Sequence, residues 1–89
     1  MSEAKVWLEN NEGQRWPIAM TCAIGRSATN DVVLEDGRVS RRHALVHRQG
    51  DAEHWVIDLG SGNGTYLNGR RVTLATRIND GDDLTIGAT

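Results

Sequence analysis

Short apolar stretches separated by polar turns recur along the whole chain, at a spacing of roughly 8 to 12 residues. No 11-residue window carries apolar residues at helical spacing, and many of the apolar residues are β-branched or aromatic, which favours strands. The pattern predicts strands over residues 4–10, 15–20, 22–26, 31–34, 43–49, 54–59, 64–68, 70–74 and 82–87. Such a run of short strands without helices is typical of an all-β domain.

The stretch 54–59, which reads HWVIDL, shows the alternation of a half-buried strand. Trp55, Ile57 and Leu59 share one face, and His54, Val56 and Asp58 share the other. This alternation suits a strand in a sheet with one buried face.

Turn signals separate several of the predicted strands. They are NNEGQ at residues 10–14, RQGDAE at residues 48–53, and Asn68 with Gly69, the strongest short hairpin signal. Pro17 cannot donate a ladder hydrogen bond, so it indicates an edge position. Short strands joined by local turns predict a β-sandwich, whose loops gather at its two ends.

The length of 89 residues allows one domain, without an internal repeat or a linker. A domain of this size buries only roughly 60 to 65% of its unfolded surface, which leaves no room for a deep pocket. We therefore expect no enclosed cofactor, and we expect any ligand to lie on surface loops.

The charge is unevenly distributed. A net charge of −2 argues against a nucleic-acid-binding protein. Half of the ten basic residues nevertheless fall within residues 26–48, whereas three aspartates cluster near the C-terminus. The simplest interpretation of such clustering is a solvated face, although arginine is also the side chain best suited to bidentate recognition of phosphate. The clustered arginines are Arg26, Arg38, Arg41, Arg42 and Arg48.

Cys22 is the single cysteine, so it cannot form an internal disulfide, and its apolar surroundings predict a buried structural thiol. The first residues, MSEAKVWLENN, lack the apolar core of a signal peptide, and every apolar stretch is too short to span a membrane. These features predict a cytoplasmic domain without membrane contact.

Neither a metal site nor an active site is indicated. His43 and His47 would stand about 13 Å apart along one strand, too far to share an ion. Ser40, His43 and Asp58 are the residue types of a catalytic triad, but the sequence has no nucleophile elbow to bring them together. We therefore expect no metal, no cofactor and no enzyme activity.

Residues 61–69, SGNGTYLNG, form a loop rich in glycine and asparagine. Glycine-rich loops often cradle phosphate, but the usual phosphate loop ends in lysine, and this chain has no lysine after Lys5. If the loop binds phosphate, the positive charge must come from another segment.

Four stretches in order, GRSATNDVVL, VSRRHA, DLGSGNGTYLNG and DGDDLTIG, resemble the forkhead-associated (FHA) domain, a family of phosphothreonine-binding β-sandwiches. The resemblance covers residues 4–87. It implies a sandwich of two twisted, largely antiparallel sheets with about 10 to 11 short strands. It also implies that residues 1–89 are a single FHA domain. Because the family usually continues into one more strand, we expect either that the domain belongs to a larger protein or that its C-terminal edge is unusually short.

The resemblance assigns the phosphate contacts to three residues. Arg26 matches the arginine that grips the phosphate, through a charge-assisted contact with a dianion. Ser40 matches the serine that donates hydroxyl and backbone hydrogen bonds to a phosphate oxygen. Arg41 corresponds to a position that contacts phosphate or peptide, and Arg42 falls at a variable position with at most a peripheral contact.

The glycine-rich loop supplies the other expected peptide contacts. Asn63 matches the asparagine whose amide bonds the peptide main chain. Asn68 sits where the family has a further asparagine near the peptide, although the Asn-Gly pair could serve only to turn a hairpin. Gly62 stands where many members carry threonine or serine, so this site is expected to rely more on backbone donors and to bind more weakly.

Five residues are expected to support the site without touching the ligand. Gly25, Gly64 and Gly69 occupy positions that require the absence of a side chain. His43 matches a histidine that braces the loop bearing Ser40, and Thr65 is expected to organise the binding loop through its hydroxyl.

The resemblance thus predicts an interaction module that recognises phosphothreonine on a partner protein, such as a serine/threonine kinase or its substrate. The alternative is an FHA-like module used for association or assembly without phosphate. The presence of Arg26, Ser40 and Asn63 together favours the first hypothesis, because a phosphate-independent module has no need of all three.

Overall fold

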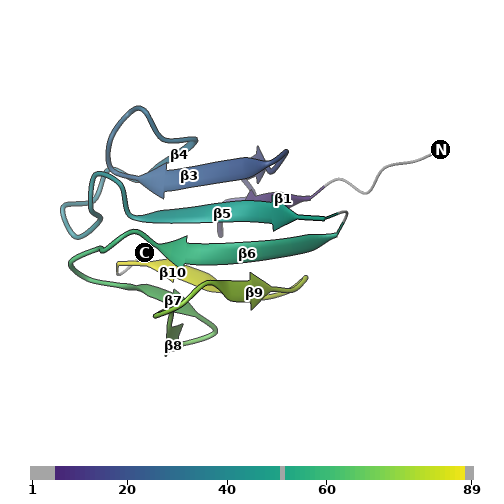
Figure 1. The fold of residues 1–89 in the computed structure, drawn as a ribbon. Helices are drawn as coiled ribbons and strands as arrows, with labels where there is room; N and C mark the ends of the chain where they lie inside the picture. Colours follow the sequence, from purple (N-terminus) through teal and green to yellow (C-terminus); the bar gives the residue numbers. More distant parts are fainter. Residues whose placement is uncertain (1–5, 51, 88–89) are drawn as a thin grey trace.

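The computed structural model describes residues 6–50 and 52–87. Within these ranges the chain folds into strands joined by turns and loops, and no helix is long and apolar enough to cross a membrane (Figure 1). The strands are β1 (Trp7–Glu9), β2 (Arg15–Pro17), β3 (Thr21–Gly25), β4 (Val32–Val33), β5 (Ala44–Gln49), β6 (Glu53–Asp58), β7 (Thr65–Leu67), β8 (Arg70–Arg71), β9 (Thr76–Ile78) and β10 (Leu84–Ile86).

Each of the nine predicted strands overlaps a strand of the structure, and β9 is the one that the pattern missed. Its sequence, TRI, contains a single apolar residue, so no alternation marks it. The strand forms because it pairs with β6, with Val56 opposite Thr76 and His54 opposite Ile78. Tertiary pairing, which local sequence does not report, decides its conformation.

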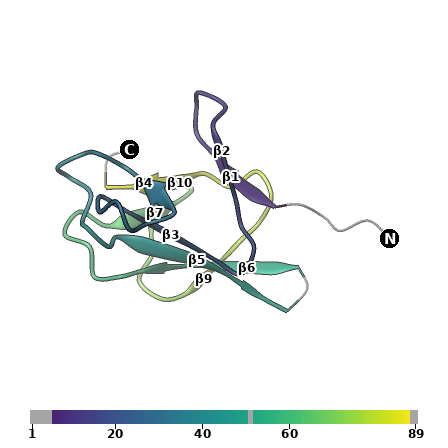
Figure 2. The ribbon, with the colours of Figure 1, turned by 90° about the horizontal axis from the view of Figure 1, so that it is seen from above.

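The strands form one large sheet and two small ones. The five-stranded sheet has the order β4-β3-β5-β6-β9, and it faces a three-stranded sheet of order β10-β7-β8. The β1–β2 hairpin forms a separate two-stranded sheet that projects from the rest (Figure 2). Every pair is antiparallel except β3 with β4. The predicted all-β sandwich of largely antiparallel sheets is confirmed, and Pro17 lies in the small sheet, where both strands are edges.

Two of the predicted turns lie entirely within the described residues. Asn10 closes the first by accepting hydrogen bonds from the N–H groups of Glu12 and Gln14. Asn68 and Gly69 have φ values of 51° and 82° and connect β7 to β8, as a two-residue hairpin turn requires. The turn at 48–53 joins β5 to β6, but its residue 51 lies outside the described residues.

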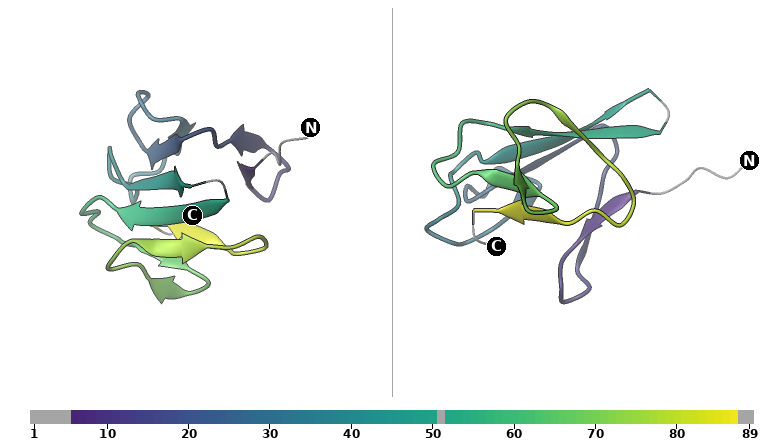
Figure 3. Two further views of the ribbon diagram at one scale, coloured as in Figure 1. Left: turned by 45° about the vertical axis from the view of Figure 1, so that its right-hand side comes forward. Right: turned by 90° about the horizontal axis from the view of Figure 1, so that it is seen from below.

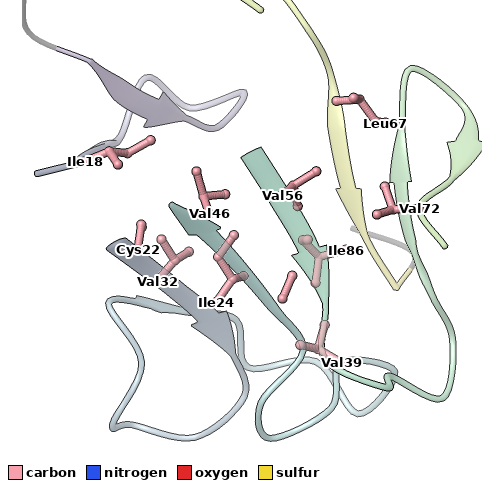
Figure 4. Packing of buried hydrophobic residues seen from close by; sticks show 11 residues of the cluster. Ile18, Cys22, Ile24, Val32, Val39, Val46, Val56, Leu67, Val72 and Ile86 are labelled. Atoms are coloured by element: carbon pink, nitrogen blue, oxygen red, sulfur yellow. The ribbon is translucent and has the colours of Figure 1, made fainter. Parts of the chain in front are cut away.

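The core lies between the five-stranded sheet and the smaller sheets (Figure 4). Side chains of β3, β5 and β6 meet those of β7 and β10 there. Cys22 is fully buried among them, and burial, with the nearby charge of Asp31, raises the pKa of its thiol to about 11. The expectation of a structural thiol is therefore confirmed, since such a group stays protonated and unreactive at neutral pH.

The predicted alternation of β6 is observed, and the structure shows which face is buried. His54 and Val56 face the core, whereas Trp55 and Ile57 are half-buried on the outer face of the sheet and Leu59 is 41% exposed. Both faces of this strand carry apolar side chains. The pairing of Val56 with the buried Val46 of β5 sets which face points inward.

A hollow of about 1110 Å³, open to solvent and not enclosed, lies between the β1–β2 hairpin and β10. The hollow exists because the hairpin stands apart from the three-stranded sheet instead of pairing with it. Its lining is about equally apolar and polar: Trp7, Trp16, Ile18 and Leu84 lie beside Arg77 and the aspartates of the turn before β10. None of the residues singled out for ligand binding from the sequence lines it.

The orientation of β6 predicts a difference between two truncations. Val56→Ala removes buried methyl groups from the core and should lower the free energy of unfolding by about 1 to 3 kcal/mol. Leu59→Ala removes a larger but exposed side chain and should cost less than about 1 kcal/mol. Urea denaturation of both variants measures the difference, and a larger loss from Leu59→Ala would contradict this packing.

Candidate functional site

Three loops converge at one end of the sandwich, on the left in Figure 1. Residues 26–31 connect β3 to β4, residues 34–43 connect β4 to β5, and residues 59–64 connect β6 to β7. Figure 3 shows the same three loops from two other directions. The residues expected to bind phosphate and peptide lie on these loops, except Asn68, which lies in the β7–β8 turn.

Backbone hydrogen bonds fasten the Arg26 segment to the Ser40 segment. The Arg26 N–H donates to the Ser40 carbonyl at 2.9 Å, and the Ser27 N–H donates to the Arg41 carbonyl at 3.2 Å. The Arg26 Nε donates to the Val39 carbonyl at 3.0 Å, which fixes the direction of the side chain. The terminal nitrogens of the guanidinium make no hydrogen bond within the described residues, so they can donate to an anion.

The close approach of these two loops depends on Gly25. A Cβ atom at this position would lie 2.2 Å from the Arg41 carbonyl oxygen and 2.8 Å from Asn30 Nδ2, closer than any real contact. Asn30 also links these two loops, because its Nδ2 donates to the carbonyls of Ser27 and Arg41, each at 2.8 Å. Sequence reasoning singled out Gly25 and missed Asn30, whose only signal was its place in a polar turn after the arginine motif.

The His43 side chain is fully buried between the second and third loops. Its Nδ1 accepts a hydrogen bond from the Ser40 N–H at 3.0 Å, and its Nε2 lies 2.7 Å from the Gly64 carbonyl oxygen. A carbonyl can only accept, so the ring carries its proton on Nε2. The imidazole thus holds Ser40 and Gly64 in fixed positions and is out of reach of a ligand.

This arrangement corrects the expected role of the Ser40 backbone. Its N–H already donates to His43, so it is not available to a phosphate. The next amide, that of Arg41, makes no hydrogen bond within the described part of the chain. The Ser40 hydroxyl oxygen accepts from the Gly62 N–H at 3.2 Å, which leaves the hydroxyl proton free to donate.

The tip of the third loop carries Asn63. Its Nδ2 donates to the Arg38 carbonyl at 2.8 Å, which orients the exposed amide and leaves its Oδ1 free to accept. Gly62, beside it, has open space where a side chain would be. The loop therefore offers an oriented amide and an unfilled position next to the Ser40 hydroxyl.

The Asp58 carboxylate is the hydrogen-bond acceptor that holds the third loop. The sequence analysis assigned it no such role. The carboxylate accepts hydrogen bonds from the N–H groups of Gly60 and Ser61 and from the hydroxyls of Ser61 and Thr65. The Ser61 hydroxyl in turn accepts from the Gly64 N–H. Thr65 is fully buried, so its hydroxyl serves this network only. The missed signal was DLGS at residues 58–61, an aspartate placed to bond the amides two and three residues ahead.

The same network sets the ionisation of Asp58. Burial by itself would raise the pKa of this carboxyl, but the hydrogen bonds from Ser61, Thr65 and Gly60 outweigh burial and hold the pKa below its usual value. The group is therefore a carboxylate at neutral pH, where it acts as the acceptor at the centre of the loop.

Gly64 and Gly69 both adopt backbone conformations that favour glycine, with φ values of 88° and 82°. The Gly64 carbonyl accepts from His43 and also from the Gly87 N–H at 3.0 Å, which ties the loop to the end of β10. Gly69 belongs to the β7–β8 turn, where a Cβ would meet open space, so its conformation alone accounts for it.

Both polar atoms of the Asn68 side-chain amide form hydrogen bonds within the domain. Its Nδ2 donates to Asp82 Oδ1 at 3.0 Å, and its Oδ1 accepts from the Asp83 N–H at 2.8 Å. Together with the left-handed backbone at Asn68, these bonds support the turn interpretation. A contact between Asn68 and a ligand stays a prediction.

The end of the sandwich that carries the three loops has several exposed arginine side chains. Arg26, Arg41 and Arg42 are exposed, and none of them forms an ion pair within the described residues. Arg38 differs, since its guanidinium is paired with Asp36 at 3.0 Å. The described residues contain no cluster of side chains that could hold a metal ion. The site can therefore attract an anion and direct N–H and O–H donors to it.

Removing the Asp58 charge should lower the free energy of unfolding, by an amount that depends on pH. Asp58→Asn replaces one acceptor oxygen by a donor, so two N–H groups or two hydroxyls lose their partner, at a cost of about 1 to 3 kcal/mol at pH 7. Because the folded-state pKa is lowered, this stabilisation is present above the unfolded value of about 3.9 and is lost as the pH falls through the folded value.

Chemical denaturation of the parent and of Asp58→Asn between pH 7 and pH 3 measures this effect. The difference in unfolding free energy should be full above about pH 4.5 and should shrink below about pH 4. Glu35→Gln, at an exposed carboxylate, is the control and should change stability by less than about 0.5 kcal/mol. A pH-independent difference would show that the carboxylate charge is not what holds the loop.

Two curated relatives show what the sequence is similar to. The chain is 42% identical over 78 residues to the oxoglutarate dehydrogenase inhibitor of Corynebacterium jeikeium, an alignment that covers 86% of this chain and 53% of that protein. It is also 42% identical over 78 residues to the glycogen accumulation regulator GarA of Mycolicibacterium smegmatis, covering 86% and 48% respectively. The chain thus spans about half the length of these relatives.

Solved structures give the same result for the fold. Mycobacterium tuberculosis EmbR, solved in complex with a low-affinity phosphopeptide, superposes with a TM-score of 0.87 at 35% identity, over 93% of this chain and 22% of that one. A structure from a study of phosphothreonine-dependent FHA domain interactions superposes with a TM-score of 0.85 at 30% identity, over 96% and 90% of the two chains.

The FHA domain family matches residues 22–87, a range that contains all three loops of the site together with the β7–β8 turn. The two curated relatives and the two solved structures agree with that match in sequence and in fold. The chain therefore belongs to the FHA domain family.

Proposed function

We propose that this domain binds phosphothreonine peptides and thereby joins the protein that carries it to a phosphorylated partner. One observation carries the proposal: the Arg26 and Ser40 backbones are hydrogen-bonded to each other, and the terminal guanidinium nitrogens and the hydroxyl proton of these two residues have no acceptor within the described residues. A phosphate dianion accepts several charge-assisted hydrogen bonds at once, which is what this donor pair offers.

The remaining contacts follow from the same geometry. The Arg41 N–H follows Ser40 in the chain and, with the exposed Arg41 side chain, would donate to the phosphate or to the adjoining peptide. The oriented Asn63 amide would bond the peptide main chain, and Gly62 would let the peptide approach the loop backbone. Gly25, His43, Gly64, Thr65 and Gly69 act by holding these groups in place.

The partner we propose is a protein phosphorylated on threonine, such as a serine/threonine kinase or its substrate, in the cytoplasm. The printed descriptions of similar structures support this choice, since one contains a phosphopeptide and another concerns phosphothreonine-dependent interactions. The domain works as an interaction module, not as an enzyme, and the greater length of its relatives supports a role within a larger protein.

Calorimetric titration with phosphothreonine peptides tests the proposal. A degenerate library first supplies a binding sequence, and its unphosphorylated form is the control. We expect a micromolar dissociation constant, or about −8 kcal/mol, and binding at least about tenfold weaker without the phosphate.

Arg26→Ala should abolish measurable binding while leaving the melting temperature nearly unchanged. Arg48→Ala removes an exposed arginine from the far end of β5 and should bind like the parent. Equal affinity for the two peptide forms would instead support association without phosphate.

Gly62→Ser should strengthen phosphopeptide binding about two- to tenfold, because it places a hydroxyl beside Ser40 where the structure has open space. Gly62→Ala fills the same space without a hydroxyl and separates the added hydrogen bond from the reduced backbone freedom. If alanine improves affinity as much as serine does, the gain comes from the backbone and not from a phosphate contact.

A further inference from the structure

The outer face of the five-stranded sheet carries more apolar side chains than an open sheet face usually does. Along β3, β5 and β6, buried positions alternate with half-buried or exposed ones, which point away from the other two sheets (Figure 2). Leu45 and Ile57 are cross-strand partners in the middle of this face, and Ala23 is paired with Leu45 on the other side. An antiparallel sheet face that meets only water normally carries polar residues at such positions.

The apolar surface extends to the strand ends that border the binding loops. Val33, at the end of β4, is 37% exposed, and Leu59, which follows β6, is 41% exposed. Trp55 is half-buried two residues before Ile57. We call this surface the outer patch, and it consists of Ala23, Val33, Leu45, Trp55, Ile57 and Leu59. A contiguous apolar patch on a small domain marks a surface that binds another molecule.

The polar side chains of this face lie mostly at its margins. Arg77 belongs to β9, the last strand in the order of the sheet, and Glu53 and Gln49 form the pair next to the β5–β6 turn. Thr21 begins β3, and His47 is the polar side chain nearest to the middle. The face thus has an apolar centre and a polar rim, as a protein–protein interface does.

The size of the face suits a weak dimer. Strands lie about 4.8 Å apart and residues about 3.3 Å apart along a strand, so five strands, with six residues in β5 and in β6, span roughly 24 Å by 20 Å. Two copies stacked on this face would together bury roughly 1,000 Å², which is near the lower limit for a specific interface. An interface of this area is typical of an association that forms and dissociates.

A second copy of the chain matches the face in twist and in polarity. Twisted sheets pack face to face with their strands inclined by about 30°, an angle that arises from the twist of both sheets. A second copy has the same twist and the same apolar centre. If a two-fold axis crosses the middle of the face, Arg77 and Glu53 of both copies stay at the rim, where water solvates them.

We propose that the outer patch joins two copies of this chain into a symmetric dimer, with their five-stranded sheets stacked face to face. This inference goes beyond the proposed function, because the dimer forms without phosphate. The three loops of the candidate site lie at the ends of the strands (Figure 1), so the dimer presents two such sites.

Sedimentation equilibrium of the 89-residue chain, between about 1 µM and about 500 µM, measures the association. We expect monomer at the lowest concentration and a dimer with a dissociation constant of about 10 to 100 µM. A chain that stays monomeric over the whole range would overturn the proposal.

Matched variants locate the contact. Leu45→Glu should weaken the dimer at least about tenfold, because it brings two like charges into the apolar centre. Leu74→Glu adds the same charge at a leucine that is 80% exposed in the β8–β9 loop, outside the outer patch, and should leave the dimer unchanged. A mixture of Leu45→Glu and Leu45→Lys should associate again, since opposite charges then meet across the two-fold axis.

A second variant of the patch carries no charge. Ile57→Thr keeps a β-branched side chain that suits a strand, and it should weaken the dimer about three- to tenfold by removing apolar area. Thermal melts check that each variant is folded. A dimer that Leu74→Glu disrupts, or that both Leu45→Glu and Ile57→Thr leave intact, would use another surface, and the proposal would be wrong.

Discussion

The buried imidazole of His43 is the interaction on which the binding loops depend. One ring nitrogen accepts from the Ser40 amide and the other donates to the Gly64 carbonyl, so two loops far apart in the sequence share one rigid support. Both bonds lie away from water, where a lost partner would leave a buried polar group unsatisfied. A surface site on a small domain can be preorganised in this way without a deep pocket.

The polar groups of the loops around His43 fall into two sets: some form hydrogen bonds within the domain, and the others are available to a ligand. Asp58 and Asn30 satisfy backbone groups within the domain, and the Ser40 amide donates to the His43 ring. The terminal nitrogens of Arg26, the Ser40 hydroxyl proton and the Asn63 Oδ1 form no hydrogen bond within the described residues. Donors that are fixed before the ligand arrives need little reorganisation, and this lowers the entropic cost of binding an anion at an exposed surface.

The hollow beside the β1–β2 hairpin has a different origin from the site. It follows from a second layer divided into a two-stranded and a three-stranded sheet, and the apolar half of its lining continues the core. The hollow therefore reflects how the layers are joined, whereas the candidate binding surface is formed by three loops that connect strands of the sandwich.

The sequence by itself determined the strands that carry alternating or β-branched residues, the Asn68–Gly69 hairpin and the motif residues Arg26, Ser40 and Asn63. These features depend on local chemistry: side-chain period, turn conformation and residue type. It also identified Gly25 as a position without room for a side chain, which the Arg41 carbonyl explains.

Only the tertiary structure decided which face of β6 is buried, since alternation defines two faces but does not say which one meets the second layer. It likewise decided that His43 uses the Ser40 amide and that β9 forms by pairing with β6. Each of these is a contact between segments whose pairing depends on strand register across the whole sandwich, and no local pattern of residues encodes that register.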